Sequence, residues 1–467
     1  MTAPTTAAET ARQELEGRLQ GRLIGPLDYD YDEARAVYNG AIDKRPALIA
    51  RCTDTADVTA ALRFGRDHGL DMAIRGGGHS GPGFGVIDGG LVIDLSPMRW
   101  VRVDPEAKLV QVGGGARLKE LDHATHAFGL ATPTGIFSVT GVGGLILGGG
   151  HGHLSRRYGL TIDNLVEADV VLADGSLERA SRDRNEDLFW AIRGGGGNFG
   201  VVTSFTFRLY PVHTVGVGIT FWPIEQTRKV LRWYREFLPG APEDLTGFFA
   251  VLVVPPGPPF PAEIHNRKVA AVVWCHTGEM ERLESALDPA RHVGTPLMHM
   301  VTLMPYPALQ SMFDPLMPPG LQWYWRGDLF DRIPDAAIDI HLEYGSRIPT
   351  PLSTMHLYAL GGAVGRVAED ETAWSHRGAL WSAVYGGIDP DPARADEIRR
   401  WCVGYQQALH PHSMGGSYVN FMGDEGKDRI RATYRGNYQR LARIKAKFDP
   451  DNVFHVNQNI EPHAARA

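Results

Sequence analysis

Three clusters of glycine constrain the fold of this chain more than any other feature of its sequence. They span residues 75–85 (RGGGHSGPGFG), 140–153 (TGVGGLILGGGHGH) and 193–200 (RGGGGNFG). Glycine supplies 55 of the 467 residues, well above the usual share of about 7%. Runs of glycine let the backbone turn sharply and leave amide N–H groups free to contact a ligand. We therefore expect the clusters to converge on one cleft that is rich in hydrogen-bond donors.

Two common nucleotide-binding motifs do not fit these clusters. Residues 76–81 and 195–200 both have the G-x-G-x-x-G spacing, but that motif requires a helix directly after it. Pro-Gly-Phe-Gly follows the first and the strand-like VVTSFTFRL follows the second. The Gly426-Lys427 pair precedes Asp rather than Ser or Thr, which excludes a P-loop. Tight turns remain the alternative interpretation of each single cluster.

The composition of the chain restricts which kinds of partner molecule and site we expect. Since 47 basic and 54 acidic residues give a net charge of −7, we expect no nucleic-acid partner. No apolar stretch reaches the roughly 20 residues of a membrane helix, and the first residues lack a signal-peptide pattern. Three widely spaced cysteines (Cys52, Cys275 and Cys402) argue against a disulfide framework. We expect a cytoplasmic protein without a membrane or metal site.

Short apolar runs bounded by Gly, Asp and Pro predict a mixed α+β fold. In the first part of the chain, strands are expected at 46–52, 71–76, 90–96, 108–115, 167–176 and 201–212, and helices at 55–68, 117–128 and 187–192. From about residue 214 the strands become longer. They are expected at 216–224, 247–254, 268–276, 321–330, 353–362 and 381–388, between helices such as 226–237 and 334–346.

The first glycine cluster contains a histidine, His79, on otherwise bare backbone. A neutral imidazole is a good nucleophile near neutral pH. In this setting the motifs resemble those of the FAD-linked oxidases of the vanillyl-alcohol oxidase type. They are most similar to the berberine-bridge-enzyme-like subgroup in its short bacterial form, similar to 6-hydroxy-D-nicotine oxidase. The segments that carry the resemblance are 75–80, 140–144, 148–150, 158–160, 163–164, 193–200, 437–438, 448–452 and 457–460.

The resemblance implies a domain order. After an N-terminal helical segment (1–45), a two-part FAD-binding domain of the PCMH type would span 46–213. A substrate domain with an antiparallel sheet flanked by helices would span 214–412. Residues 413–467 would form a C-terminal segment that returns to the FAD-binding domain.

The resemblance also implies that FAD is bonded covalently through His79, the histidine that carries the flavin in the family. Phe137 stands where many relatives have the cysteine of a second link, so we expect a single attachment. Thr140, at the position thought to govern oxygen access in resembling plant enzymes, permits oxidase behaviour. The resemblance places the following residues at the cofactor: Arg75, Gly76, Gly77, Gly78, His79, Ser80, Gly135, Thr140, Gly141, Gly144, Gly149, Gly150, His153, Asn198, Val202, Asn420 and Asn457.

The catalytic base does not follow directly from the resemblance. Relatives often use a Tyr in an aromatic-x-Asn-Tyr strand, which here reads Tyr418-Val-Asn420-Phe421. Phe421 cannot accept a proton, but Tyr418 and Asn420 would share one face of a strand. Arg366 stands where other relatives use a Glu on a strand that matches residues 361–367. We therefore expect Tyr418, Asn420 and Arg366 at the catalytic position. Either Tyr418 or a histidine (His356 or His153) is the base, or the reaction differs from that of the relatives.

The second domain is rich in aromatic residues, among them Trp274, Tyr344, Tyr358 and Trp381, and aromatic residues on strands lie more often in a core than in a pocket. Trp323 and Trp325 would share a face opposite to Tyr324, so that one of these sets lines the cleft. Such a weakly charged pocket suits a flat or glycosylated hydroxylated metabolite better than a phosphorylated one.

Together these features predict an FAD-dependent oxidoreductase, specifically an oxidase. It would take hydride from a hydroxylated or amine small molecule, for example a sugar or a secondary metabolite, and pass electrons to dioxygen to give peroxide. Two alternatives stay open. One is a flavin dehydrogenase that uses another acceptor, and the other is a non-catalytic flavin- or drug-binding protein of the same fold.

Overall fold

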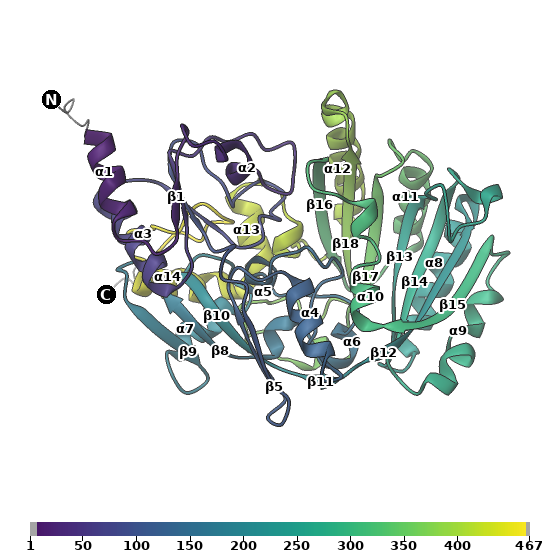
Figure 1. Ribbon diagram of the computed structural model, residues 1–467. Helices are drawn as coiled ribbons and strands as arrows, with labels where there is room; N and C mark the ends of the chain where they lie inside the picture. The colour runs from purple at the N-terminus through teal and green to yellow at the C-terminus, as the bar shows by residue number, and fades with distance from the viewer. Residues whose placement is uncertain (1–6, 464–467) are drawn as a thin grey trace.

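The computed structural model describes residues 7–463, with side chains from residue 12 onward. Two halves lie side by side (Figure 1). One half contains the described chain up to Pro211 together with the C-terminal helices, whereas the other is built around one large sheet. Within residues 7–463 no helix has the length and apolar character needed to cross a bilayer.

A small four-stranded sheet opens the first half and leads into the first glycine cluster. Its order is β1-β2-β4-β3, with β2 and β3 parallel to β4. Helix α3 (Thr55–Asp67) covers it and is capped by Asp54, whose side chain accepts from the Asp57 amide at 2.9 Å. The first glycine cluster follows β3 directly. The strands are β1 (Arg22–Ile24), β2 (Leu48–Arg51), β3 (Met72–Arg75) and β4 (Leu91–Asp94).

A five-stranded antiparallel sheet of order β5-β6-β10-β8-β9 forms the second part of this half. Helices from both ends of the chain pack around it, and the C-terminal helices lie in this half (Figure 1). Its strands are β5 (Val101–Asp104), β6 (Leu109–Gly113), β8 (Leu165–Val171), β9 (Leu177–Ser181) and β10 (Val201–Arg208). The helices of this half are α1 (Ala7–Glu16), α2 (Tyr31–Arg35), α4 (Leu118–His126), α5 (Val142–Leu147), α6 (Ser155–Tyr158), α7 (Glu186–Ile192), α13 (Lys427–Tyr434) and α14 (Tyr438–Phe448).

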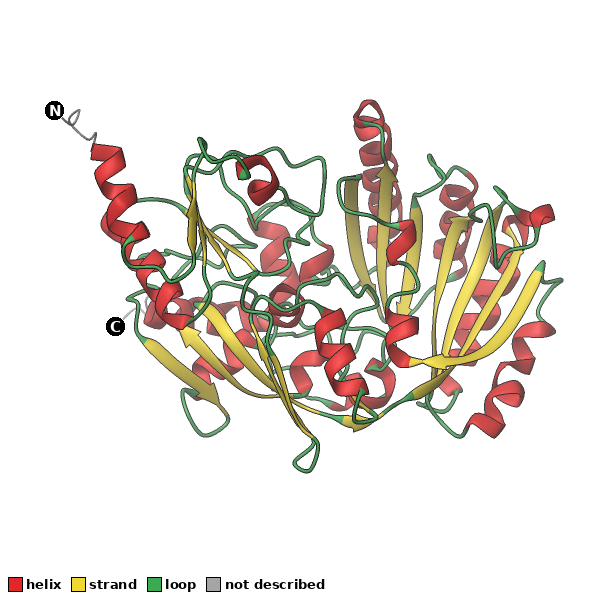
Figure 2. Ribbon diagram, in the orientation of Figure 1, coloured by secondary structure: helices red, strands yellow, loops and turns green. Residues whose placement is uncertain are grey.

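The second half contains a seven-stranded antiparallel sheet of order β15-β12-β14-β13-β17-β18-β16. Helices cover one of its faces (Figure 2). They are α8 (Thr227–Gly240), α9 (Leu283–Arg291), α11 (Asp335–Ser346) and α12 (Ala395–Leu409), while α10 (Tyr306–Gln310) packs on α4. The strands are β12 (Thr214–Pro223), β13 (Leu245–Val253), β14 (Lys268–His276), β15 (Met298–Pro305), β16 (Gln322–Phe330), β17 (Thr354–Ala359) and β18 (Trp381–Asp389); β7 (Leu130–Ala131) and β11 (Tyr210–Pro211) form a separate ribbon.

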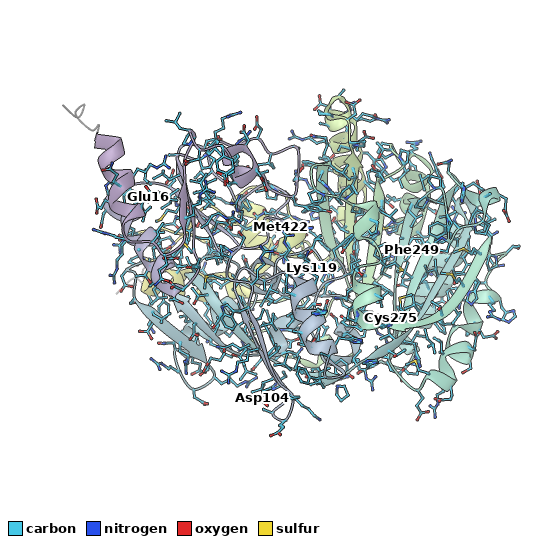
Figure 3. The ribbon with its side chains drawn as sticks, in the orientation of Figure 1. Glu16, Asp104, Lys119, Phe249, Cys275 and Met422 are labelled. Atoms are coloured by element: carbon cyan, nitrogen blue, oxygen red, sulfur yellow. The ribbon has the colours of Figure 1, made fainter. Side chains whose placement is uncertain are left out.

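Alternation along these strands separates two sets of side chains. Phe249 and Leu357 pack under the helices, whereas their neighbours Phe248 and Tyr358 face the first half. Phe249 and Cys275 lie within the second half, and Met422, from the C-terminal segment, lies with the first (Figure 3). The open face of the large sheet therefore meets the first half.

The mixed fold with a two-part first domain and a helix-flanked antiparallel sheet is confirmed. All the strands and helices that the sequence predicted in these two regions are present to within a few residues. Three features differ from expectation. Residues 1–45 contribute strand β1 as well as helices, and residues 361–367 do not form a strand. Residues 419–421 form a 3₁₀ turn, because β16 and β18 complete the sheet without them.

Candidate functional site

A cavity of about 350 Å³ lies where the glycine clusters meet the open face of the large sheet. Its volume falls in the range of small-molecule sites. All three clusters, β16 to β18 and the C-terminal segment contribute to its lining. Most of the residues predicted at the cofactor line it: Arg75, Gly76, Gly77, Gly78, His79, Ser80, Gly135, Thr140, Gly141, Gly144, Asn198, Val202, Asn420 and Asn457.

Four predicted residues lie outside the lining. Gly149 and Gly150 lie behind it, where the Gly150 amide donates to the Tyr418 hydroxyl at 3.0 Å. His153 is buried against Phe248. The catalytic prediction for Arg366 is wrong, because its side chain is 61% exposed and forms a two-point ion pair with Glu243 at the surface.

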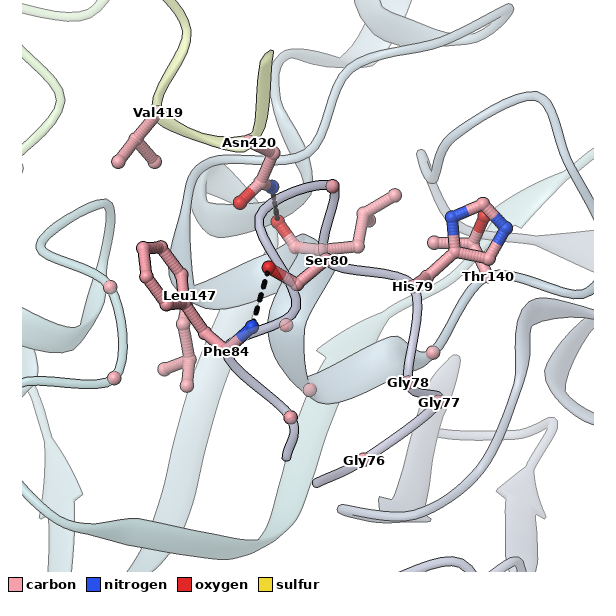
Figure 4. A pocket seen from close by; sticks show the side chains of 18 of the residues that line it. Gly76, Gly77, Gly78, His79, Ser80, Phe84, Thr140, Leu147, Val419 and Asn420 are labelled. Carbon is pink, nitrogen blue, oxygen red and sulfur yellow. Dashed lines mark hydrogen bonds between the residues drawn. The ribbon is translucent and has the colours of Figure 1, made fainter. Parts of the chain in front are cut away.

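The first two glycine clusters touch through their backbones. A Cβ on Gly77 would lie 2.4 Å from the Gly141 Cα, and one on Gly141 would lie 2.3 Å from the Gly77 nitrogen. Gly78 has a φ of +67°, in the left-handed region that favours glycine. The loop from Gly76 to Ser80 is therefore held against the start of α5 without side chains between them, as Figure 4 shows from close by.

This loop presents hydrogen-bond donors without a matching positive charge. Among the described residues, the amides from Gly76 to Gly81 donate to no other residue. Arg75 is the one Arg or Lys side chain among the lining residues, and it is paired with buried Asp94 at 2.9 Å. Successive free amides bind anions such as a pyrophosphate without a cationic side chain. The predicted donor-rich, nearly neutral cleft is thus present.

His79 lies at the end of this loop with its imidazole restrained but unpartnered. Its ring stacks on Tyr38, with centroids 3.8 Å apart and an interplanar angle of 20°. Nε2 is buried without a hydrogen-bond partner. Burial lowers the pKa of His79 to about 4, so the ring is neutral at neutral pH. Nδ1, which no described residue bonds, is not among the fully buried atoms, so the neutral imidazole keeps an accessible nitrogen that is suited to bond formation with a ligand carbon.

The C-terminal segment closes the third glycine cluster. Lys445 is fully buried and donates to Asp449 at 2.6 Å and to the Asn198 carbonyl at 2.7 Å. The Asn198 side chain donates to Gly195 at 2.9 Å and to Gln458 at 3.2 Å. These contacts position Asn198 at the cavity, together with Asn457, whose amide donates to the Gly197 carbonyl.

Tyr418 and Asn420 meet in the cavity although they do not lie on a strand. The Asn420 amide donates to the Tyr418 hydroxyl at 2.8 Å and to the Leu145 carbonyl at 3.0 Å. Burial raises the pKa of Tyr418 to about 12, while Asn420 and the Gly150 amide act in the opposite direction. Tyr418 is therefore a neutral phenol at neutral pH.

Two further histidines line the cavity, and only one of them was a candidate from the sequence. His356, an expected candidate, lines the cavity, with Nδ1 2.8 Å from the Tyr358 hydroxyl. His151 also lines it and was not predicted there, since His153 was preferred. The sequence feature that could have identified His151 was its position directly after Gly148–Gly150, because His79 likewise follows three glycines, Gly76–Gly78. Of the aromatic residues, Trp323 and Trp325 line the cavity and Tyr324 faces away, toward Arg399.

The buried histidines make the folded state sensitive to acid. Burial lowers the pKa of each, so the unfolded chain binds more protons as the pH falls from about 6.5 to about 4, and stability decreases over this window. Asp122, whose pKa burial raises to about 7, opposes this effect as a single group. We expect a lower urea midpoint at pH 5 than at pH 7.5; an equal or higher midpoint would contradict the burial of neutral rings. The histidines are His151 and His341, with a pKa of about 3, and His153, His356 and His376, with a pKa of about 4.

Comparison with known proteins supports the interpretation of this site. Residues 46–181 match the family model described as FAD binding domain, and residues 417–461 match that of berberine and berberine-like proteins. An FAD-linked oxidoreductase of Dictyostelium discoideum is 33% identical over 430 residues, which cover 91% of each chain. This chain is an FAD-linked oxidoreductase of the berberine-like family.

Two further relatives of this oxidoreductase have names that state their own activity. The (R)-6-hydroxynicotine oxidase of Paenarthrobacter nicotinovorans is 29% identical over 461 residues, covering 95% of this chain and 97% of its own. A solved structure of glucooligosaccharide oxidase from Acremonium strictum, with a 6-S-cysteinyl, 8α-N1-histidyl FAD, is 25% identical. It has a TM-score of 0.84 and covers 97% of this chain and 99% of its own.

The residues of this oxidoreductase fit FAD on structural grounds. The free amides of the first loop suit the pyrophosphate, and the unpartnered His79 imidazole lies at the end of the same loop. The cavity continues from there to the Tyr418 and His356 side chains. Bound FAD supplies the redox chemistry by accepting a hydride and passing electrons on, so the protein has to position substrate, exclude water and move protons.

Proposed function

We propose that this oxidoreductase holds FAD through a single covalent bond to His79 and oxidises a neutral small molecule at a C–H beside a hydroxyl or amine. Electrons then pass to dioxygen, which becomes hydrogen peroxide. The observation that carries the proposal is the neutral, half-buried His79 ring, which has no hydrogen-bond partner among the described residues and lies at one end of a cavity lined by all three glycine clusters. The covalently bound FAD of glucooligosaccharide oxidase supports it.

The positions of the cysteines support one covalent bond to FAD rather than two. Cys52, Cys275 and Cys402 are buried and unpaired, and none of them lines the cavity. Phe137 lines it instead, at the position where the second link was expected in relatives. Among the described residues, the cavity lining therefore holds no cysteine sulfur that could form a thioether to the flavin.

The charge of the cavity supports a neutral substrate. Within the described part of the chain its lining contains no carboxylate, and Arg75 is already paired with Asp94. Trp323, Trp325 and Phe421 offer flat apolar surfaces to a ring. The two relatives are named for a hydroxylated nicotine and for glucooligosaccharides, neither of which carries a carboxylate or a phosphate. Transfer to oxygen and a cytoplasmic location are proposals that follow from the sequence analysis.

The proposed function is tested by supplying (R)-6-hydroxynicotine, cellobiose and benzyl alcohol to the purified holoenzyme. We expect oxygen consumption with at least one of them, matched by an equal amount of peroxide. If the enzyme instead reduces an artificial electron-accepting dye with one of these substrates and forms no peroxide, the result would support a flavin dehydrogenase. Neither signal with any of the three would support a non-catalytic flavin-binding protein.

A further inference from the structure

We propose that His356 is the catalytic base of this oxidation and that Tyr358 is its positioning residue, because it fixes the tautomer that carries the ring proton on Nδ1. The proposal rests on the proposed function, since a base is needed only if a hydroxyl or amine is oxidised in this cavity. It assigns the proton-accepting role that Phe421 cannot fill.

The geometry of β17 brings the two side chains together. His356 and Tyr358 are two residues apart, so both face the cavity. When His356 Nδ1–H donates to the Tyr358 oxygen, 2.8 Å away, Nε2 keeps its lone pair. Among the described residues Nε2 has no hydrogen-bond partner, and it is not one of the fully buried unpartnered atoms. It is therefore accessible from the cavity.

The other candidates lack a free acceptor at the cavity. The Tyr418 oxygen already accepts from the Gly150 amide and the Asn420 side chain, so its remaining capacity is to donate its own proton. His153 lies outside the cavity lining, and its Nε2 is buried. His151, which lines the cavity, pairs Nε2 with Ser382 at 3.1 Å, and its Nδ1 is buried without access to the cavity. Tyr418 is thus suited to hold the substrate oxygen by donation, while His356 accepts the proton.

The surroundings of His356 keep it unprotonated. Phe248 and Ala250 on β13 and Val384 on β18 are its apolar neighbours. The titratable groups around this end of the cavity are Tyr358 on its own strand and Tyr418, His151 and His153 across from it, and none of them is an acid at neutral pH. Burial lowers the pKa of His356 to about 4. The lone pair is therefore available throughout the neutral range.

The step balances as follows for an alcohol. The O–H bond breaks and its proton moves to His356 Nε2, while the adjacent C–H bond breaks and its hydride, with two electrons, moves to FAD. The substrate becomes a carbonyl compound, and an amine gives an imine. His356 then releases its proton to water. Dioxygen takes the two electrons with the hydride's hydrogen and one proton from water, which together give hydrogen peroxide.

The tautomer can be measured without turnover. In the holoenzyme labelled with ¹⁵N-histidine, and with His356→Gln used for assignment, we expect a protonated Nδ1 and an unprotonated Nε2 at pH 7. Tyr358→Phe removes the acceptor and should shift the equilibrium toward the Nε2–H form. A wild-type ring protonated on Nε2 would overturn the proposal, because that nitrogen could then only donate.

Flavin reduction gives the second readout, by anaerobic stopped flow with the three probes named above. His356→Gln should slow reduction by at least about 100-fold and leave reoxidation of the dithionite-reduced enzyme by oxygen unchanged. His341→Gln is the matched control, because His341 is equally buried and bonded through Nδ1 to the Tyr405 hydroxyl at 2.8 Å, outside the cavity. It should leave the reduction rate unchanged.

The pH profile separates His356 from Tyr418. With His356 as base, the reduction rate is flat between pH 6 and 9 and falls toward pH 4, as the ring becomes protonated. With Tyr418 as base it would rise by about tenfold per pH unit over the same range, which would overturn the proposal, as would a loss below about tenfold in His356→Gln. If no probe reduces the wild-type flavin while reoxidation is normal, the proposed function itself fails, and the role of His356 fails with it.

Discussion

Replacement of His79 by alanine is expected to release all of the flavin from the protein on acid precipitation. In the wild type the yellow colour should stay in the pellet, because a covalent bond survives denaturation of the fold. The imidazole is prepared for this bond by its stacking on Tyr38 and by burial that keeps it neutral. In His79→Ala the flavin should appear quantitatively in the supernatant, measured by its absorbance.

A matched control comes from the neighbouring histidine outside the lining. His153 is also buried, has its pKa lowered to about 4 and has an unpartnered Nε2. His153→Ala should nevertheless keep the flavin in the pellet, because only His79 lies on the loop that faces the cavity. Colourless wild-type pellets would show that FAD is held without a bond. A His153→Ala pellet without colour would show that burial, rather than position, decides the attachment.

The sequence predicted the cofactor half of the site better than the catalytic half. A glycine loop can be recognised from the local sequence, because the free amides, the left-handed Gly78 and the imidazole at position 79 all lie in one short segment. The resemblance to the family supplied the rest of the set, and nearly every residue that it places at the cofactor lines the cavity. The exceptions are Gly149 and Gly150, which lie one layer behind beside Tyr418, and His153, which is buried against Phe248.

The catalytic half depends on contacts between segments far apart in the chain, and these cannot be read from local patterns. Tyr418 and Asn420 were expected to meet on a strand, but they meet through a 3₁₀ turn. Arg366 was placed by analogy on a strand that ends earlier, at Ala359, so its side chain reaches solvent. The alternation of Thr354, His356 and Tyr358 along β17 was the available signal for this side of the cavity.

The second large effect is expected from Gly77→Ala. A methyl group here would lie 2.4 Å from the Gly141 Cα and 2.5 Å from its nitrogen. Both contacts are with backbone, so no side chain can rotate away, and the two clusters have to separate. We expect a loss of more than about 2 kcal/mol in the free energy of unfolding, measured by urea denaturation, together with loss of bound flavin. Unchanged stability would contradict the close approach.

Gly144→Ala separates the binding of FAD from the packing of the fold. Nothing lies within 4 Å of a Cβ at Gly144, and the residue lines the cavity within helix α5. Alanine in a helix is favourable by up to about 1 kcal/mol, so stability should stay equal or rise while flavin content falls. Gly436→Ala, also open but outside the cavity, should change neither. If Gly144→Ala keeps its full flavin content, the ligand does not need the open space at this position, and the proposed contact of the second glycine cluster with FAD is wrong here.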